Sequence, residues 1–198
     1  NPIVTGWRAR AVMARVWASL LRLALSRYSP MQAIQAVRTL YSHARRNCAA
    51  TGGGWPPKLV RGAGRYFFHL NYPGFPSPAF DRFAVRQLDR VNSNSGPANQ
   101  LQTLILAITR RCPLACQHCS EWKTLNNGPE RLTRDDLLAI ASHFEARGVT
   151  QVLLSGGEPL VRLDDILALC RAERPGMDYW IATSGHRLNA AAAARLAE

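Results

Sequence analysis

Residues 104–119 read Leu104-Ile-Leu-Ala-Ile-Thr-Arg-Arg-Cys112-Pro-Leu-Ala-Cys116-Gln-His-Cys119. The apolar run at the start has the length and composition of a strand, so the cysteines are expected on the loop that leaves its carboxyl end. Three thiolates on one short loop can close around a metal ion or an iron–sulfur cluster. With no fourth cysteine beside them, one iron of a 4Fe–4S cluster would lack a protein ligand, and catalysis takes place at open metal positions.

Two other interpretations of these cysteines fit the sequence less well. A zinc site with His118 or a distant residue as fourth ligand would be expected to show paired cysteines or a Cys pair with a His pair, and this loop shows neither pattern cleanly. A disulfide framework is disfavoured because the chain holds 5 cysteines, an odd number, without framework-like spacing. That cysteine usage indicates a reducing compartment, and we expect the protein to be cytoplasmic.

A second loop of interest, Ser155-Gly-Gly-Glu-Pro159, directly follows a second apolar run, Thr150–Leu154. Such a nearly uniform run is typical of a strand in a parallel sheet. A third strand is predicted over 178–183. Helices are predicted from a cap at Thr133 to Gly148, over 164–172, with Cys170 as a small buried residue, and from 188 onward. Three βα repeats predict an α/β fold with a right-handed parallel half-barrel.

At these two loops the chain resembles radical S-adenosylmethionine (radical SAM) enzymes, which carry a Cys-x3-Cys-x-aromatic-Cys loop after the first strand of a partial (β/α) barrel. His118 stands at the aromatic position. The resemblance covers Leu104 to about Gly185. It implies that about the first three βα units of such a barrel are present. The site residues that it implies are Cys112, Cys116 and Cys119 as ligands of a 4Fe–4S cluster, Gly156, Gly157, Glu158 and Pro159 around the amino group of SAM, and Thr183 and Ser184 beside its ribose.

The resemblance also implies a reaction. A flavodoxin- or ferredoxin-like donor would reduce the cluster, SAM would be cleaved to methionine and a 5′-deoxyadenosyl radical, and that radical would abstract a substrate hydrogen. Two glycines would let backbone carbonyls approach the SAM ammonium group, and Glu158 would add a charged acceptor. The cysteine loop that opens at Thr109 and the Gly-Gly-Glu-Pro loop are similar to those of the branch that includes SPASM-type, peptide-modifying and molybdopterin-pathway enzymes. A peptide, a biosynthetic intermediate or a lipid-linked molecule is therefore expected as substrate, and no catalytic residue is assigned.

The charge of the chain divides it into two parts. Residues 1–98 hold 14 Lys and Arg against 2 Asp and Glu, whereas residues 99–198 hold 11 of each. This change predicts a basic, mainly helical N-terminal region over 1–98 and the half-barrel over 99–198, joined at the polar linker Asn92–Pro97. Because the chain begins with Asn1 and ends at Glu198 in a helical run, we expect a fragment of a longer protein.

The N-terminal region is predicted to contain helices over 7–28, 31–47 and 80–91 and a short strand over 64–70. The first helix has an arginine stripe opposite apolar residues and two tryptophans, Trp7 and Trp17. It would either contact an anionic membrane surface or pack on neighbouring protein, and packing is favoured. Ile34 and Val37 are expected on the apolar face of the second helix. Binding of nucleic acid is disfavoured because the arginines are dispersed, although a cluster- or zinc-binding regulator with a nucleic-acid-binding front is the alternative function.

Overall fold

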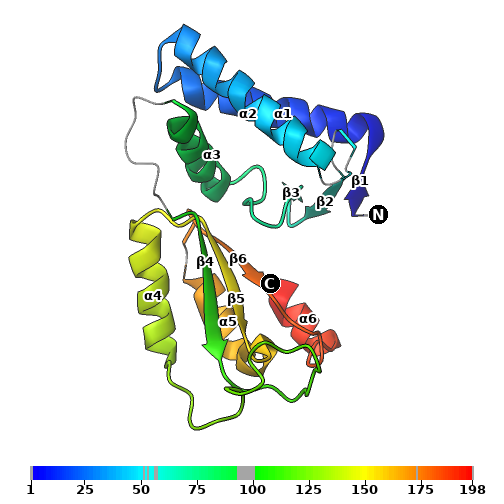
Figure 1. The fold of residues 1–198 in the computed structure, drawn as a ribbon, viewed down its shortest axis with the longest axis vertical. Coiled ribbons are helices and arrows are strands. Elements are labelled where there is room, and N and C mark those ends of the chain that lie inside the picture. The colour runs from blue at the N-terminus through cyan, green and yellow to red at the C-terminus, as the bar shows by residue number, and fades with distance from the viewer. Residues whose placement is uncertain are drawn as a thin grey trace. The chain divides into compact units, whose positions relative to one another are not determined.

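The structure is a computed structural model that describes residues 2–50, 52, 54–55, 58–92, 101–172 and 174–197. The chain forms two compact units, Asn1–Gln100 and Leu101–Glu198 (Figure 1). Beyond Asn92, the linker predicted over 92–97 lies outside the described residues.

The N-terminal unit combines three helices with a small antiparallel sheet. Its elements are β1 (Ile3–Val4), α1 (Gly6–Leu25), α2 (Pro30–Ala50), β2 (Leu59–Gly62), β3 (Arg65–Phe67) and α3 (Pro78–Val91). The sheet has the order β1-β2-β3. The three helices predicted from periodicity are present. Strands β1 and β2 were not predicted, because segments of two and four residues are too short to show a period.

Helix α1 buries its apolar side inside this unit. The buried residues are Ala9, Val12, Met13, Val16, Leu20 and Ala24, and the helix contacts both α2 and α3. The apolar face predicted for α2 is wrong at Ile34, whose side chain is 51% exposed, while Ala33 and Ala36 are buried. Small alanine side chains allow close approach to the rest of the unit, which turns the larger Ile34 outward.

The C-terminal unit is a parallel sheet with helices between its strands. Its elements are β4 (Thr103–Thr109), α4 (Arg134–Ala146), β5 (Gln151–Gly156), the 3-10 helix η1 (Pro159–Arg162), α5 (Leu163–Arg171), β6 (Asp178–Ile181) and α6 (Ala190–Ala197). The strands pair in the order β4-β5-β6, both pairs parallel. The predicted mixed α/β architecture with a parallel sheet is confirmed. The carboxyl ends of the strands therefore lie at one edge of the sheet (Figure 1).

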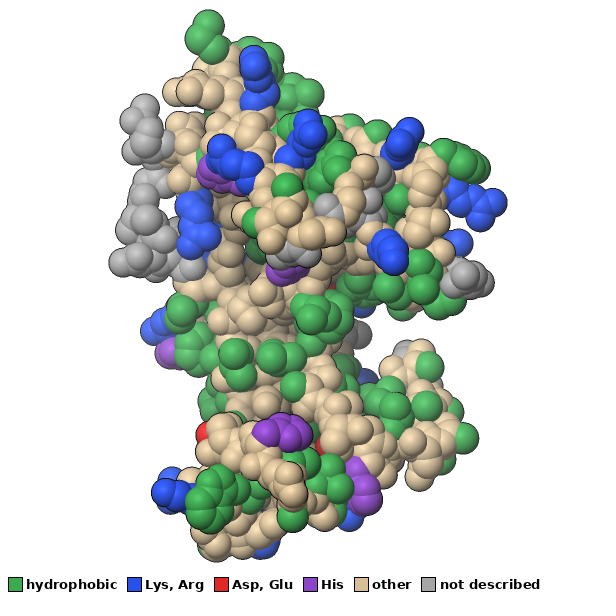
Figure 2. Space-filling model, turned by 45° about the vertical axis from the view of Figure 1, so that its right-hand side comes forward, with side chains coloured by type: hydrophobic (Ala, Val, Ile, Leu, Met, Phe, Trp, Pro, Cys, Tyr) green, Lys and Arg blue, Asp and Glu red, His purple; other side chains and the backbone are tan. Residues whose placement is uncertain are grey.

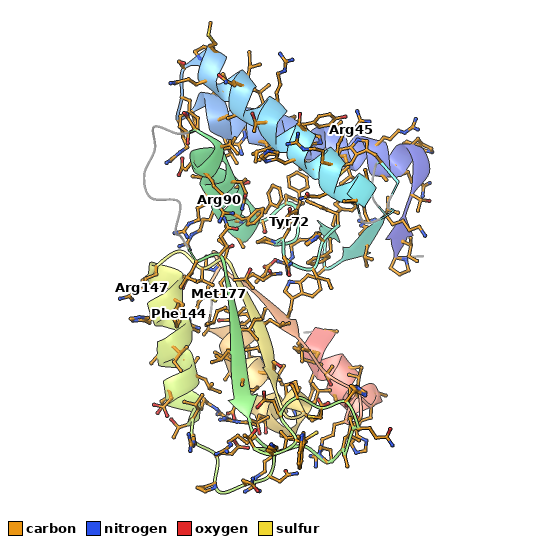
Figure 3. The ribbon with its side chains drawn as sticks, in the orientation of Figure 1. Arg45, Tyr72, Arg90, Phe144, Arg147 and Met177 are labelled. Carbon is orange, nitrogen blue, oxygen red and sulfur yellow. The ribbon has the colours of Figure 1, made fainter. Side chains whose placement is uncertain are left out.

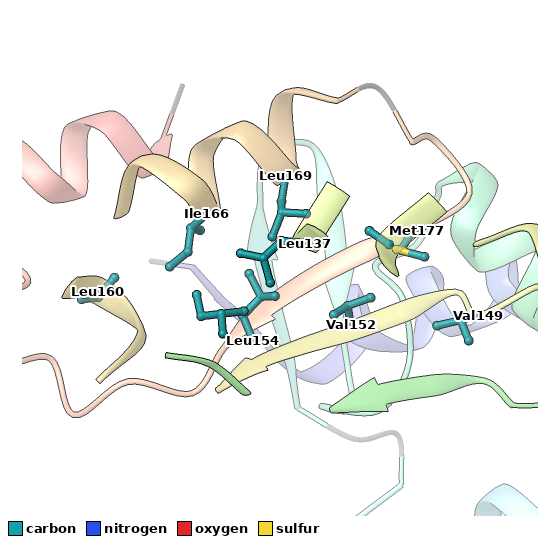
Figure 4. Packing of buried hydrophobic residues seen from close by; sticks show 10 residues of the cluster. Leu137, Val149, Val152, Leu154, Leu160, Ile166, Leu169 and Met177 are labelled. Carbon is teal, nitrogen blue, oxygen red and sulfur yellow. The ribbon is translucent and has the colours of Figure 1, made fainter. Parts of the chain in front are cut away.

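The core of this unit lies between the sheet and helices α4 and α5 (Figure 4). Its buried members include Ile108, Leu137, Val152, Leu154, Ile166 and Leu169. Helix α4 begins at a complete capping box, in which Thr133 and Asp136 each bond the other's backbone N–H. The prediction that Cys170 is buried is wrong. Ile166 and Leu169 occupy the inner face of α5, so Cys170 falls on its exposed side.

Across the described residues, the helices are too short or too polar to cross a bilayer.

Candidate functional site

The three cysteines of the first loop follow β4, as predicted. Cys112 and Cys119 are partly buried and Cys116 is exposed, and all three are free thiols. The backbone N–H of Cys119 donates to the carbonyl of Cys116 at 3.1 Å, which gives the loop a tight turn at its centre. Within the described residues, no three His, Cys, Asp or Glu side chains are arranged to hold one metal ion. The donor set fits a cluster by chemistry and by sequence proximity, and ligation by these thiols stays a prediction.

Asn126 fixes the start of the cysteine loop. Its side-chain oxygen accepts from the N–H of Cys112 at 3.1 Å, and its side-chain nitrogen donates to the carbonyl of Cys112 at 2.9 Å. Its own N–H donates to the carbonyl of Arg110 at 2.9 Å. Asn126 has a φ of 59°, a left-handed conformation that asparagine adopts more readily than most residues. The two side-chain bonds to Cys112 close the loop that contains the three cysteines.

Thr109 and Glu130 hold the junction between β4 and the loop. The hydroxyl of Thr109 donates to the carboxylate of Glu130 at 2.5 Å and accepts from the N–H of Arg111 at 2.9 Å. A cavity of about 540 Å³ opens beside this junction. Its lining includes Arg111, Cys112, Asn126, Glu130, Arg162 and Arg187.

The Gly-Gly-Glu loop after β5 packs directly against the backbone of the cysteine loop. Gly157 and Glu158 donate backbone hydrogen bonds to the carbonyls of Thr109 at 2.9 Å and Arg111 at 2.8 Å. A Cβ on Gly156 would lie 2.3 Å from the Thr109 carbonyl oxygen, and one on Gly157 would lie 2.3 Å from that of Arg111. Both glycines are therefore required by the close approach of the two loops, a reason that their sequence pattern alone did not reveal.

Glu158 lies at the centre of a hydrogen-bond network and is only 1% exposed. One carboxylate oxygen accepts from the N–H of Leu160 at 3.0 Å and the hydroxyl of Thr183 at 2.5 Å. The other accepts from the N–H of Ser184 at 2.9 Å and from its hydroxyl at 2.5 Å. Burial alone would raise the pKa of Glu158, but the hydrogen bonds from Ser184, Thr183 and Leu160 outweigh it and hold the pKa below its ordinary value.

These bonds fill the acceptor positions of the Glu158 carboxylate, which number about four. The sequence predicted that Glu158 would accept from the cofactor and that Thr183 and Ser184 would contact its ribose. The structure brings these three residues together, but it directs both hydroxyl hydrogens at Glu158. The side chain of Glu158 thus connects the loop after β5 to the loop after β6.

Arg162 is a further residue of this edge that the sequence did not single out. Its guanidinium donates to the carbonyls of Ile108 at 2.7 Å and Leu132 at 2.8 Å, and to Asp165 at 2.7 Å. Burial would raise the pKa of Asp165, but its bonds to Arg134 and Arg162 keep that pKa below the ordinary value. Neither Asn126 nor Arg162 could be identified from sequence, because the backbone groups that their side chains bond lie 14 residues away for Asn126 and 30 and 54 residues away for Arg162.

A parallel sheet that carries a three-cysteine loop and a Gly-Gly-Glu loop in contact at its carboxyl edge defines the class of site found in radical SAM proteins. Residues 106–198 match the model of the radical SAM superfamily. Members of that superfamily use a 4Fe–4S cluster and S-adenosylmethionine.

The curated proteins that the chain resembles include peptide and GTP cyclases. It is 35% identical over 95 residues to a PqqA peptide cyclase of Rhodopseudomonas palustris, covering 48% of this chain and 25% of that protein. It is 33% identical over 91 residues to the mitochondrial GTP 3′,8-cyclase of Arabidopsis thaliana, covering 41% and 23%. With molybdenum cofactor biosynthesis protein 1 of Bos taurus the identity is 37% over 89 residues, covering 43% and 14%. The chain thus spans about a quarter or less of these relatives, and no solved structure matches it.

Proposed function

We propose that residues 101–198 form the cofactor-binding part of a radical SAM enzyme. In this proposal Cys112, Cys116 and Cys119 hold a 4Fe–4S cluster, and the loops after β5 and β6 hold SAM beside it. The observation that carries the proposal is the packing of Gly156 and Gly157 on the backbone of the cysteine loop. Two motifs separated in sequence form one surface, so a cofactor held by one loop would lie beside a cluster held by the other.

When bound, the cluster and SAM would supply a 5′-deoxyadenosyl radical that abstracts a hydrogen atom from the substrate. The protein would contribute orientation and exclusion of water. Asn126 would fix the peptide of the first cysteine, an outer-shell role of the kind that tunes metal sites. Pro159, which opens η1 directly after Glu158 and is buried, would set the direction in which the loop leaves the site.

In this arrangement Glu158 is a positioning residue. Because its carboxylate is already satisfied by the chain, we propose that it shapes the SAM site by fixing Thr183 and Ser184. The two hydroxyls already accept from the backbone N–H groups of Gly185 and His186, so one acceptor position on each would be available to the ribose.

The rest of the proposal concerns the whole protein. We propose that the sheet continues as a partial (β/α) barrel, that a flavodoxin- or ferredoxin-like protein donates the electron, and that the reaction takes place in the cytoplasm. Relatives are named for cyclisation of a peptide and of GTP. We therefore propose a peptide or a small biosynthetic intermediate as substrate, with a lipid-linked molecule as the alternative.

The test is formation of 5′-deoxyadenosine by the protein reconstituted with iron and sulfide under anaerobic conditions and supplied with dithionite and SAM. The wild type should form this product, and Cys116→Ala should not. Cys170→Ala is the matched control because it removes an exposed thiol outside the loop, and it should retain the wild-type rate. Equal product from Cys116→Ala and wild type would overturn the proposal.

We also propose that the start of α1 contacts an anionic membrane surface. The apolar side of α1 is buried in its own unit, so only its exposed residues are available, chiefly Trp7, which is 74% exposed, and the arginines around it. Figure 2 shows Lys and Arg side chains on the visible face of the molecule. Binding would be mainly electrostatic and should fall with salt. Flotation of the chain with vesicles containing phosphatidylserine, but not with phosphatidylcholine vesicles, would support this contact, and no flotation would exclude it.

A further inference from the structure

The N-terminal unit contains a cavity of about 380 Å³, formed by α1, α2, α3 and the segment around Phe68–Tyr72. Its volume lies within the range of roughly 300–1,000 Å³ that is usual for small-molecule sites. All of its lining residues belong to this unit, and none comes from the cysteine loop.

The floor of the cavity is apolar and inaccessible to water. Val16 and Phe80 are each 2% exposed and Ala84 is 1% exposed. They come from α1 and α3, which contact each other, and they belong to one buried apolar cluster of the unit. Floor residues of this kind offer a ligand no hydrogen bonds, and the apolar surface that a ligand would remove from water belongs to the partly exposed walls.

The walls are aromatic. Trp17 and Trp55 lie with their ring centroids 6.5 Å apart. On the other side, Tyr72 packs on Phe83 at 4.8 Å, and Phe68 packs on Phe80 at 6.2 Å. Burial, followed by the nearby Cys48, raises the pKa of the Tyr72 phenol, as expected for a wall of low polarity. Figure 3 labels Tyr72 in this part of the unit.

Four polar lining residues are exposed, whereas a fifth, Gln87, is partly buried. His43, Asn47, His69 and Arg90 are all exposed, and the ring of His69 stacks on Tyr72 at 4.5 Å. Arg90, labelled on α3 in Figure 3, is the charged member. Among the described residues the lining contains no Asp or Glu.

We propose that this cavity binds an amphiphile with one apolar chain and one anionic head group, with the chain between the aromatic walls and the head group beside Arg90 and the two imidazoles. The separation of polar groups selects this class. A peptide or a nucleotide needs hydrogen-bond partners along its length, and the floor and walls offer very few, whereas a single-chain carboxylate or phosphate ester is polar only at one end. The basic balance of this region complements an anion.

The first test is equilibrium dialysis of the full chain against radiolabelled dodecanoate below its micelle concentration. We expect one saturable site, and dodecylamine, which has the same chain with a positive head group, should bind at least about tenfold more weakly. Arg90→Gln should weaken dodecanoate binding by about tenfold, since it removes a charge-assisted partner. Arg45→Gln, which removes an exposed arginine that does not line the cavity (Figure 3), should have no effect.

A second measurement needs no variant. Cys48 lines the cavity, and Cys170 is exposed in the other unit. Alkylation of the two cysteines by iodoacetamide can be measured by mass spectrometry. Saturating dodecanoate should slow the alkylation of Cys48 by at least about tenfold and leave the alkylation rate of Cys170 unchanged. Absence of a saturable site, equal binding of dodecylamine, or equal slowing at both cysteines would each overturn the proposal. Both tests run without a cluster, so their outcome is independent of the proposed SAM chemistry.

Discussion

The carboxylate of Glu158 accepts hydrogen bonds from both the hydroxyl and the backbone N–H of Ser184, at 2.5 and 2.9 Å. The two residues stand 26 positions apart, at the ends of neighbouring parallel strands. This pair therefore connects the Gly-Gly-Glu loop to the loop after β6, and the shape of the proposed SAM site depends on it.

Replacement of Glu158 by glutamine should destabilise the C-terminal unit. The side-chain NH2 of glutamine would face a donor of Ser184, and two donors cannot form a hydrogen bond. A buried polar group would then lack a partner, at a cost of about 1–3 kcal/mol. Denaturant unfolding should show this loss of free energy of unfolding. Glu121→Gln is the control, since Glu121 is exposed, and it should stay within about 0.5 kcal/mol of wild type.

The contribution of Glu158 should also depend on pH. Its folded-state pKa is lowered, so its stabilisation is present above the unfolded carboxyl pKa of about 4.3 and is lost as pH falls through the folded value. The difference in unfolding free energy between wild type and Glu158→Gln should therefore be constant from about pH 7 to 5 and shrink below about pH 4.3. A difference that grew on acidification would contradict the network described here.

Substitution of Gly157 by alanine should force the two loops apart. The added Cβ would lie 2.3 Å from the carbonyl oxygen of Arg111 and 3.0 Å from Cβ of Cys112. We expect a destabilisation of about 1–3 kcal/mol, as for other overpacked sites, measured by thermal unfolding. Gly54→Ala is the matched control, because a Cβ there has open space and its φ is not positive. An unchanged melting temperature for Gly157→Ala would show that the loops are not in contact.

Removal of the Asn126 side chain should weaken cluster binding. Asn126→Gly keeps a residue that accepts the positive φ but loses both bonds to Cys112. Loss of an outer-shell partner typically costs roughly 10–100-fold in metal affinity. Iron and sulfide content after anaerobic reconstitution with limiting iron should fall accordingly. Asn127→Gly, which loses only a bond to the Lys123 carbonyl, should load as wild type does.

The sheet and the two loops could be predicted from sequence because their signals are local. The runs before Cys112 and Gly156 are continuous and apolar, and they became the paired strands β4 and β5. The long-range hydrogen bonds could not be predicted, since a buried glutamate and a surface glutamate have the same sequence signature. The prediction that Glu158 binds the cofactor therefore rested on its motif alone, and its hydrogen bonds with Thr183 and Ser184 could not be predicted.

The same limit applies to the N-terminal unit. The amphipathic pattern of α1 predicted a packed helix, and its apolar side is buried. His43, Cys48 and His69 had no recognisable spacing and received no function from the sequence. They line one cavity only because α2 and the segment before α3 fold onto the same side of α1.

The most direct test of the central claim is electron paramagnetic resonance of the anaerobically reconstituted and reduced protein, with and without SAM. The account predicts a 4Fe–4S signal that SAM perturbs in the wild type and in Gly54→Ala, and a perturbation that is lost in Gly157→Ala at equal cluster content. A signal that SAM leaves unchanged in the wild type, or zinc in place of the cluster, would contradict the claim that the two loops form one SAM and cluster site.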